Sequence, residues 1–151
     1  MAISWRSPIF WDSLSWVVPT ENQRHMSDSQ HEQQVLAAVS QASEQWKNAF
    51  NSGDAAGCAA NYEDDATMHA RPFGTFTGTE AIQTFWQGLI DGGYSDVEYI
   101  EPNVEVISTT EAILTSKWKM NKASGVIHKE LWVIQENGVA KLREDDFEAI
   151  A

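Results

Sequence analysis

The stretch from Trp46 to Trp86 constrains the fold most, because it carries a complete run of helix, turn and strand signals. A first helix ends at a Gly53-Asp54 break, and a short second helix and a turn at Asp64-Asp65 follow. A strand from Ala66 to Ala70 comes next, and a third helix begins at about Thr79. The stretch therefore predicts that helices and strands share one core.

The helices before the strand have clear bounds in the sequence. The first is predicted over Ser29 to Asn51, and the second over Asp54 to about Tyr62, with Asp54 as its N-cap. Apolar residues recur in the first helix at three- and four-residue spacing, which is typical of one buried face. These residues are Val35, Leu36, Val39, Ala42, Trp46, Ala49 and Phe50.

Beyond Gly92-Gly93 the apolar period changes from that of a helix to that of a strand. Alternating segments begin near Val97 and run through Ile113–Met120, Val126–Ile134 and Val139–Phe147. Glu136-Asn137-Gly138 is a hairpin turn signal between the last two. Helices first and an antiparallel run afterwards predict an α+β fold.

The first 30 residues differ in composition from the rest. They hold three of the seven tryptophans, Trp5, Trp11 and Trp16, but neither a cleavable signal pattern nor a run long enough to span a membrane. Residues 20–31 are polar and typical of a linker, and Met26 is a candidate natural start. We expect an extension over residues 1–30, poorly ordered or lying on the surface, and one domain over residues 31–151.

Composition excludes several classes of function. The chain has 22 acidic and 10 basic residues, a formal charge of −12, which opposes binding to nucleic acid or to an anionic membrane. The single cysteine, Cys58, rules out an internal disulfide and reads as a small buried side chain. The four histidines lie far apart and no phosphate-binding glycine motif is present, so we expect no metal and no cofactor. A cytoplasmic location is expected.

The order and spacing of these elements resemble the NTF2-like superfamily, in particular its SnoaL-like, DUF4440 and ketosteroid isomerase branches. The resemblance covers roughly residues 30 to 150. It implies a cone-shaped α+β barrel in which three N-terminal helices pack on a curved, mostly antiparallel sheet. It also implies a small-molecule pocket inside the cone.

The face of the sheet toward which each strand side chain points follows from the alternation of side chains along the strand. In residues 111–121 the lysines should face water, so Leu114, Ser116, Trp118 and Met120 should face inward. In residues 126–135 both faces are half apolar, and only the family resemblance selects His128, Glu130, Trp132 and Ile134 as the inner set. The same comparison places Arg143, Asp145 and Phe147 inside and Leu142 outside.

These assignments define a candidate site with an apolar wall and a few polar groups, the usual character of a small-molecule site. Glu130, Asp145 and His128 are the candidate acid–base residues. An alternative reading stays open, in which Arg143 pairs with Glu130 or Asp145 and simply closes the fold. The expected ligand-contacting residues are Trp46, Met68, Trp118, Met120, Trp132, Arg143 and Phe147.

Ketosteroid isomerases, which the chain resembles, use a tyrosine and a protonated acid around the developing oxyanion and a carboxylate base. Aligned on this sequence, the tyrosine position falls on Trp46, the base on Ala70 and the acid on Glu130. Alanine cannot abstract a proton, so the standard isomerase mechanism is not expected. Cyclases of the SnoaL type suggest Asp145 and His128 as the acid–base pair instead.

Three functional classes remain open. The first is a cofactor-independent enzyme, an isomerase, cyclase or hydrolase-like protein that moves a proton on a small apolar or aromatic compound. The second is a ligand-binding module without turnover, and the third is an association domain. A homodimer is expected through the outer face of the sheet, because that face should carry apolar residues. These are Ile127, Leu131, Val133 and Leu142.

Overall fold

The computed structural model describes residues 21–151, and side chains from Ser29 onward. The chain divides into two compact units, residues 1–31 and residues 32–151. The expectation of a poorly ordered extension falls mostly on residues 1–20, outside the described residues. The linker expected over residues 20–31 is wrong where it can be checked, because the helix begins at Glu21.

The described chain holds three helices and six strands. The helices are α2 (Glu21–Asn51), α3 (Ala55–Ala59) and α4 (Thr79–Asp91). The strands are β1 (Tyr62–Arg71), β2 (Gly74–Thr77), β3 (Glu98–Val106), β4 (Glu111–Lys119), β5 (Ser124–Ile134) and β6 (Ala140–Ala149).

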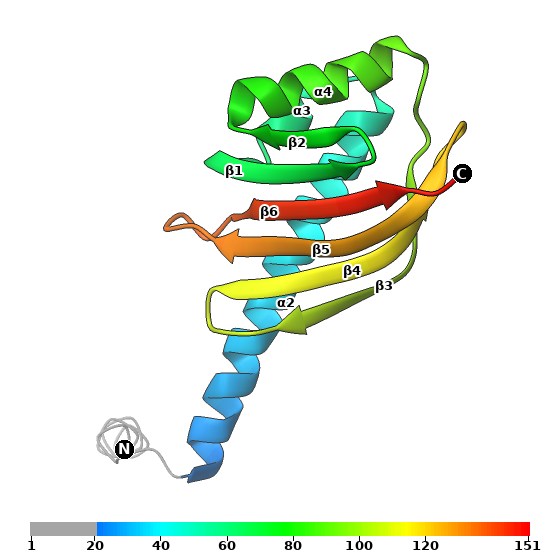
Figure 1. Cartoon of the computed structure of the whole chain (residues 1–151). Helices are drawn as coiled ribbons and strands as arrows, with labels where there is room; N and C mark the ends of the chain where they lie inside the picture. The colour runs from blue at the N-terminus through cyan, green and yellow to red at the C-terminus, as the bar shows by residue number, and fades with distance from the viewer. Residues whose placement is uncertain (1–20) are drawn as a thin grey trace, which may run out of the picture. The chain divides into compact units, whose positions relative to one another are not determined.

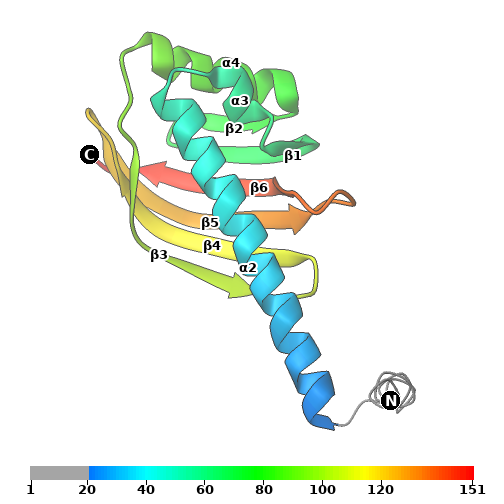
Figure 2. The same cartoon turned by 180° about the vertical axis from the view of Figure 1, so that it is seen from behind.

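The strands form one sheet in the order β2-β1-β6-β5-β4-β3. Only β1 and β6 are parallel, so the sheet is mostly antiparallel, as the sequence predicts. The sheet is curved and does not close into a barrel, since β2 and β3 remain its two edges (Figure 1). Seen from behind, the part of α2 within residues 32–51 crosses one face of the sheet, which is the inner face, and its buried residues join the core there (Figure 2).

Local signals position the helices as expected. Gly53 leaves α2 with φ +80°, a conformation that glycine adopts without strain, and Asp54 caps α3 by accepting a 2.9 Å hydrogen bond from the amide of Gly57. The stripe of α2 is buried at Val39, Phe50 and Trp46. Cys58 is buried in α3, and burial raises the pKa of its thiol to about 12, so it serves as an apolar core group.

Register shifts decide which residues of β5 and β6 face inward. The pairing of these strands is irregular between Ile127 and Lys129 and again between Leu131 and Trp132. An extra residue in a strand moves all later side chains to the other face. Ile127 therefore lies inside along with Glu130, although an unbroken alternation would place them on opposite faces.

Besides Ile127, the irregular register corrects three further predicted orientations. Leu142 is buried in the core rather than on the outer face, and Arg143 is exposed rather than inside. His128 is likewise exposed. Asp145 and Phe147 lie inside, as predicted.

The outer face carries ion pairs where apolar residues were expected. Arg143 Nε lies 2.7 Å from Glu63 Oε1, and His128 Nε2 lies 2.9 Å from Glu148 Oε1. Further pairs on this face are Arg71–Asp146 and Lys129–Glu144. Of the four residues expected to form an apolar outer patch, Ile127 and Leu142 point into the core instead.

Within residues 21–151, none of the helices combines the length and the apolar character that crossing a bilayer requires.

Candidate functional site

A cavity of about 180 Å³ lies between the inner face of the sheet and the helices of residues 32–151. Aromatic side chains make up about half of the residues in its wall, and aliphatic residues, several of them from β5, β6 and α4, supply much of the rest. The aromatic lining residues are Trp46, Tyr62, Phe73, Phe85, Trp86, Tyr94, Tyr99, Trp118, Trp132 and Phe147. A cavity with such walls favours a small apolar ligand.

Two carboxyl groups interrupt this apolar wall. Glu130 on β5 and Asp145 on β6 are directly opposite each other in the sheet and are 5% and 3% exposed. Among the described residues, no arginine, lysine or histidine forms an ion pair with either group. Arg143, the partner expected from sequence, pairs with Glu63 on the other face. Both carboxyls therefore remain in an apolar cavity without a neutralising cation.

Neutral donors hold the two carboxyls in place. The indole Nε1 of Trp132 donates a 2.9 Å hydrogen bond to Glu130 Oε1. The hydroxyl of Tyr62 lies 2.6 Å from Asp145 Oδ2 and donates to it. The other oxygen of Asp145, Oδ1, is buried and has no hydrogen-bond partner among the described residues. Buried polar atoms without a partner are rare in native structures, and such an atom beside a cavity often marks a functional role.

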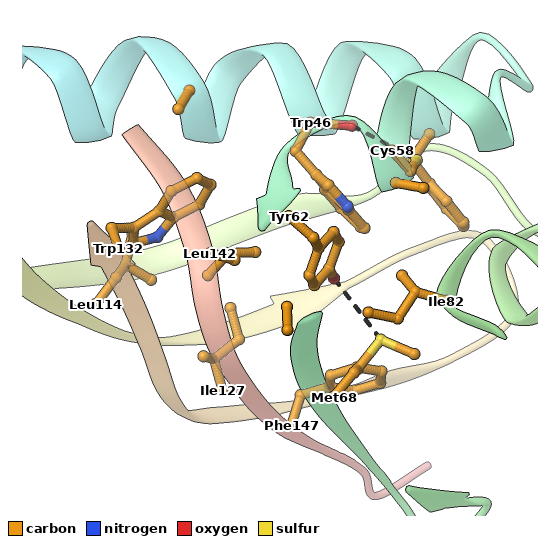
Figure 3. Close-up of a cluster of buried hydrophobic side chains, with 14 of the residues drawn as sticks. Trp46, Cys58, Tyr62, Met68, Ile82, Leu114, Ile127, Trp132, Leu142 and Phe147 are labelled. Carbon is orange, nitrogen blue, oxygen red and sulfur yellow. Dashed lines mark hydrogen bonds between the residues drawn. The ribbon is translucent and has the colours of Figure 1, made fainter. Parts of the chain in front are cut away.

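Tyr62 was missed by the sequence analysis, which placed it at the end of the second helix. It is the first residue of β1, and its ring lies between Trp46 and Met68, whose sulfur is 3.6 Å from the hydroxyl (Figure 3). Alternation alone does not identify it, because the pairing of β1 is irregular between Tyr62 and Thr67 and Asp64, which shares the parity of Ala66 and Met68, is exposed.

Burial makes both carboxyls weak acids. Loss of solvent raises the pKa of Asp145 to about 7, although the hydrogen bond from Tyr62 opposes this change. Loss of solvent raises the pKa of Glu130 well above its ordinary value, and the nearby Asp145 charge raises it further. Glu130 therefore keeps its proton to a higher pH than an exposed glutamate does, and Asp145 is poised between its two forms near pH 7.

The structure brings most of the predicted site residues together. The lining includes Glu130 and Asp145, together with Trp46, Trp118, Met120, Trp132 and Phe147. Met68 is fully buried and contacts Tyr62 behind the wall. His128 and Arg143 lie on the outer face, away from the cavity.

Further lining residues were not singled out from sequence. Trp86 was assigned only to the apolar face of the third helix, and Tyr99 only to an alternating strand. Both line the cavity. Both residues are far from Glu130 in the sequence. They lie near it around the cavity because the sheet is curved.

The arrangement is suited to moving a proton. An ionised Asp145 accepts one, and a protonated Glu130 donates one or hydrogen-bonds a carbonyl oxygen. Environments that separate the pKa values of two neighbouring carboxyls are a recurring basis for acid–base assignment. Within residues 21–151, His, Cys, Asp and Glu form no cluster that would hold a metal ion.

Similar folds occur in several solved structures. A candidate scytalone dehydratase from Novosphingobium aromaticivorans is 16% identical, with 82% of this chain and 89% of that chain covered and a TM-score of 0.69. A ketosteroid isomerase-like protein from Erwinia carotovora atroseptica is 18% identical, with 77% and 96% covered and a TM-score of 0.66.

A third structure is a candidate calcium/calmodulin dependent protein kinase II association domain from Xanthomonas campestris. It is 12% identical, with 76% of this chain and 85% of that chain covered and a TM-score of 0.64. At these identities the three structures establish the fold alone. The sequence has no match among curated proteins.

The family model of the SnoaL-like domain matches residues 43–127, which is more than half of the chain. The match begins in α2 and ends in β5, so it includes the helices and strands that build most of the cavity wall. The chain therefore belongs to the SnoaL-like family of the NTF2-like superfamily.

Proposed function

We propose that the protein is a cofactor-independent enzyme of the isomerase or lyase type, which moves a proton on a small apolar or aromatic compound. One observation carries the proposal. Two carboxyls with raised pKa values, Glu130 and Asp145, face the same aromatic cavity without a basic partner. Such an arrangement is costly to the fold, and catalytic sites are where such costs are found.

In this proposal Asp145 is the general base. Tyr62 orients its carboxylate through Oδ2, and Oδ1, which is buried and has no partner among the described residues, is the oxygen proposed to accept a proton from carbon or oxygen of the ligand. Glu130, oriented by Trp132, donates a hydrogen bond to the ligand oxygen on which negative charge develops. The aromatic wall excludes water, which strengthens both interactions.

The assignment also accounts for the alanine at the position of the usual isomerase base. Ala70 is fully buried, and its backbone is paired with Phe147 of β6, two residues beyond Asp145. A base on β6 instead of β1 still faces the same cavity. Dehydration and isomerisation, the reactions that two neighbours are named for, both require a proton to be moved.

The test uses 2-tetralone, a small aromatic ketone with exchangeable α-hydrogens. We expect the protein to accelerate their exchange for deuterium in D₂O, as followed by proton NMR, with a pH dependence centred near 7. Asp145→Asn should reduce the rate by about 100-fold or more, the scale of one positioned base. Asp146→Asn is the matched control, because Asp146 pairs with Arg71 on the outer face.

The alternative is a ligand-binding module without turnover, which the same cavity would serve. Binding without exchange would identify it: 2-tetralone would raise the thermal midpoint in proportion to RT ln(1 + [L]/Kd) while its α-hydrogens stay unexchanged. If 2-tetralone neither raises the thermal midpoint nor exchanges its α-hydrogens, the cavity is neither a catalytic site nor a binding site of the proposed kind.

We also propose that the protein forms a homodimer through the outer face of the sheet. Leu131 and Val133 remain on this face, among the ion pairs of Arg143, His128 and Lys129. Support is weaker than the sequence suggested, because two of the four expected apolar residues point inward. The association domain among the structural neighbours is compatible with pairing.

A further inference from the structure

The charged groups of the cavity are almost all negative. Glu130 and Asp145 are its acidic lining residues, and Lys122 is the one basic residue among the described lining residues. Lys122 is exposed and donates a 2.9 Å hydrogen bond to the carbonyl of Gly92, so its charge stays at the surface. The interior of the cavity thus has two potential negative charges and no positive one.

Aromatic rings are the second feature of the wall that could hold a cation. Trp46, Trp86 and Trp118 line the cavity, yet the Nε1 atom of each is buried away from solvent and has no hydrogen-bond partner among the described residues. The polar N–H edges therefore do not open into the cavity, and the rings present carbon surface to it. The faces of aromatic rings carry the negative end of their quadrupole, which attracts cations.

The rim of the cavity already contains a contact of this kind. The ammonium of Lys122 lies 5.5 Å from the ring centroid of Tyr94, within the range of a cation–π interaction. Both residues line the cavity. A cation supplied by a ligand would find the same type of ring deeper inside, together with carboxyls that no protein cation neutralises.

We propose that the cavity takes an organic cation, an aromatic or alicyclic compound that bears a protonated amine or a quaternary ammonium group. This proposal rests on the proposed function in one respect, which is that the ligand binds in the cavity. The cation would lie against the aromatic wall near Asp145 and Glu130 and would keep Asp145 in the carboxylate form that a base requires. A neutral ligand of the same shape gains only the apolar contacts.

The test compares two probes of nearly identical shape, phenyltrimethylammonium and tert-butylbenzene, by titration of tryptophan fluorescence. At pH 8 we expect the cation to bind at least 10-fold more tightly. At pH 5 Asp145 is protonated and Glu130 is more protonated than an exposed glutamate, so the preference should shrink. Glu130, Tyr62, Tyr99 and Asp146 are the titratable groups around Asp145, and of these only Glu130 should share the change.

Variants locate the effect. Asp145→Asn should reduce the preference for the cation at pH 8 by about 10-fold, whereas Glu144→Gln, which removes the partner of Lys129 on the outer face, should leave it unchanged. The second variant matters because a chain of charge −12 attracts any cation weakly to its surface. Calorimetry at pH 6 in two buffers of different ionisation enthalpy should show that cation binding releases protons.

Equal or tighter binding of tert-butylbenzene at pH 8 would overturn the inference, as would the failure of both probes to bind. These results are separate from the exchange assay. Exchange of 2-tetralone without a preference for the cation would leave the proposed function standing and remove the inference. A preference for the cation without exchange of 2-tetralone would support the inference and remove the proposed proton transfer.

Discussion

At the scale of single residues, Asp145 and Glu130 destabilise the fold near neutral pH, because each loses hydration without gaining a cation. The raised pKa values fix the sign of this effect. The folded chain keeps a proton on Asp145 up to about pH 7, whereas an unfolded aspartate loses it near its ordinary value of 3.8. Stability from this group is complete below pH 4 and is lost as the pH rises toward 7.

The first prediction follows from this dependence. Asp145→Asn should flatten the pH profile of the free energy of unfolding between pH 4 and pH 8, since asparagine does not ionise and still accepts from Tyr62. The variant should remove a pH-dependent change in the free energy of unfolding of up to about 4 kcal/mol, because the pKa of Asp145 lies roughly three pH units above its ordinary value. Urea unfolding at a series of pH values measures it. A variant whose slope equals that of the wild type would contradict the assigned pKa.

The second prediction concerns Glu130→Gln. The sequence analysis left open that Glu130 pairs with Arg143, in which case its loss would destabilise the fold. Arg143 forms its ion pair with Glu63 instead. The Glu130→Gln variant should therefore unfold at a urea concentration equal to or higher than that of the wild type at pH 8. Glu63→Gln, which does remove the partner of Arg143, is the comparison and should be mildly destabilising. A loss of about 3 kcal/mol in Glu130→Gln would return Glu130 to a structural role.

At the scale of elements, regular periodicity was predictable and irregular pairing was not. The stripe of α2 and the inward set of β4 follow simple spacing, and most of their members are buried as predicted, although Leu36 is exposed and Met120 only partly buried. His128 and Arg143 were placed on the wrong face because register shifts interrupt β5 and β6. Nothing in the local sequence marks these shifts, which depend on how neighbouring strands pair.

A close approach between two strands also positions the cavity wall. Gly125 of β5 is paired with Trp118 of β4, and a Cβ atom on this glycine would clash with the backbone oxygen of Glu148 on β6 and lie 2.6 Å from the Trp118 ring. The glycine therefore leaves room both for the β6 backbone and for the ring that lines the cavity. Alternation alone assigned Trp118 to the inner face but gave no reason for the glycine opposite it.

The third prediction uses this contact. Gly125→Ala should displace the Trp118 ring and lower the free energy of unfolding by about 1–3 kcal/mol, the usual cost of overpacking. Gly88→Ala is the matched control, because no atom lies within 4 Å of its added Cβ in α4 and alanine favours helix. Urea unfolding compares them. Equal stability of the two variants would show that Gly125 has no packing role.

At the scale of the whole molecule, the sequence predicted the α+β class and the family, because both depend on the order of elements. The homodimer was argued from an apolar outer face that the structure replaces largely with ion pairs. Any dimer through this face would have a polar contact surface. Such surfaces respond to ionic strength, because salt screens charged groups that remain accessible to solvent.

The fourth prediction is therefore a salt-dependent homodimer. Sedimentation equilibrium at micromolar concentration should give twice the mass of 16.9 kDa in low salt, and Leu131→Glu should shift the equilibrium toward the monomer. The control is Leu36→Glu, since Leu36 is a partly exposed residue of α2 rather than of the sheet. A wild-type monomer at every salt concentration would exclude the homodimer.

The central claim is that a carboxyl in the cavity titrates near neutral pH. Carbon-13 NMR of the side-chain carboxyls measures this directly, with Asp145→Asn and Glu130→Gln used to assign the two signals. We predict that the Asp145 signal titrates near pH 7 and that the Glu130 signal stays in its protonated position to higher pH. Titration of both signals below pH 5 would show that the carboxyls are ordinary solvated groups and would contradict the acid–base account.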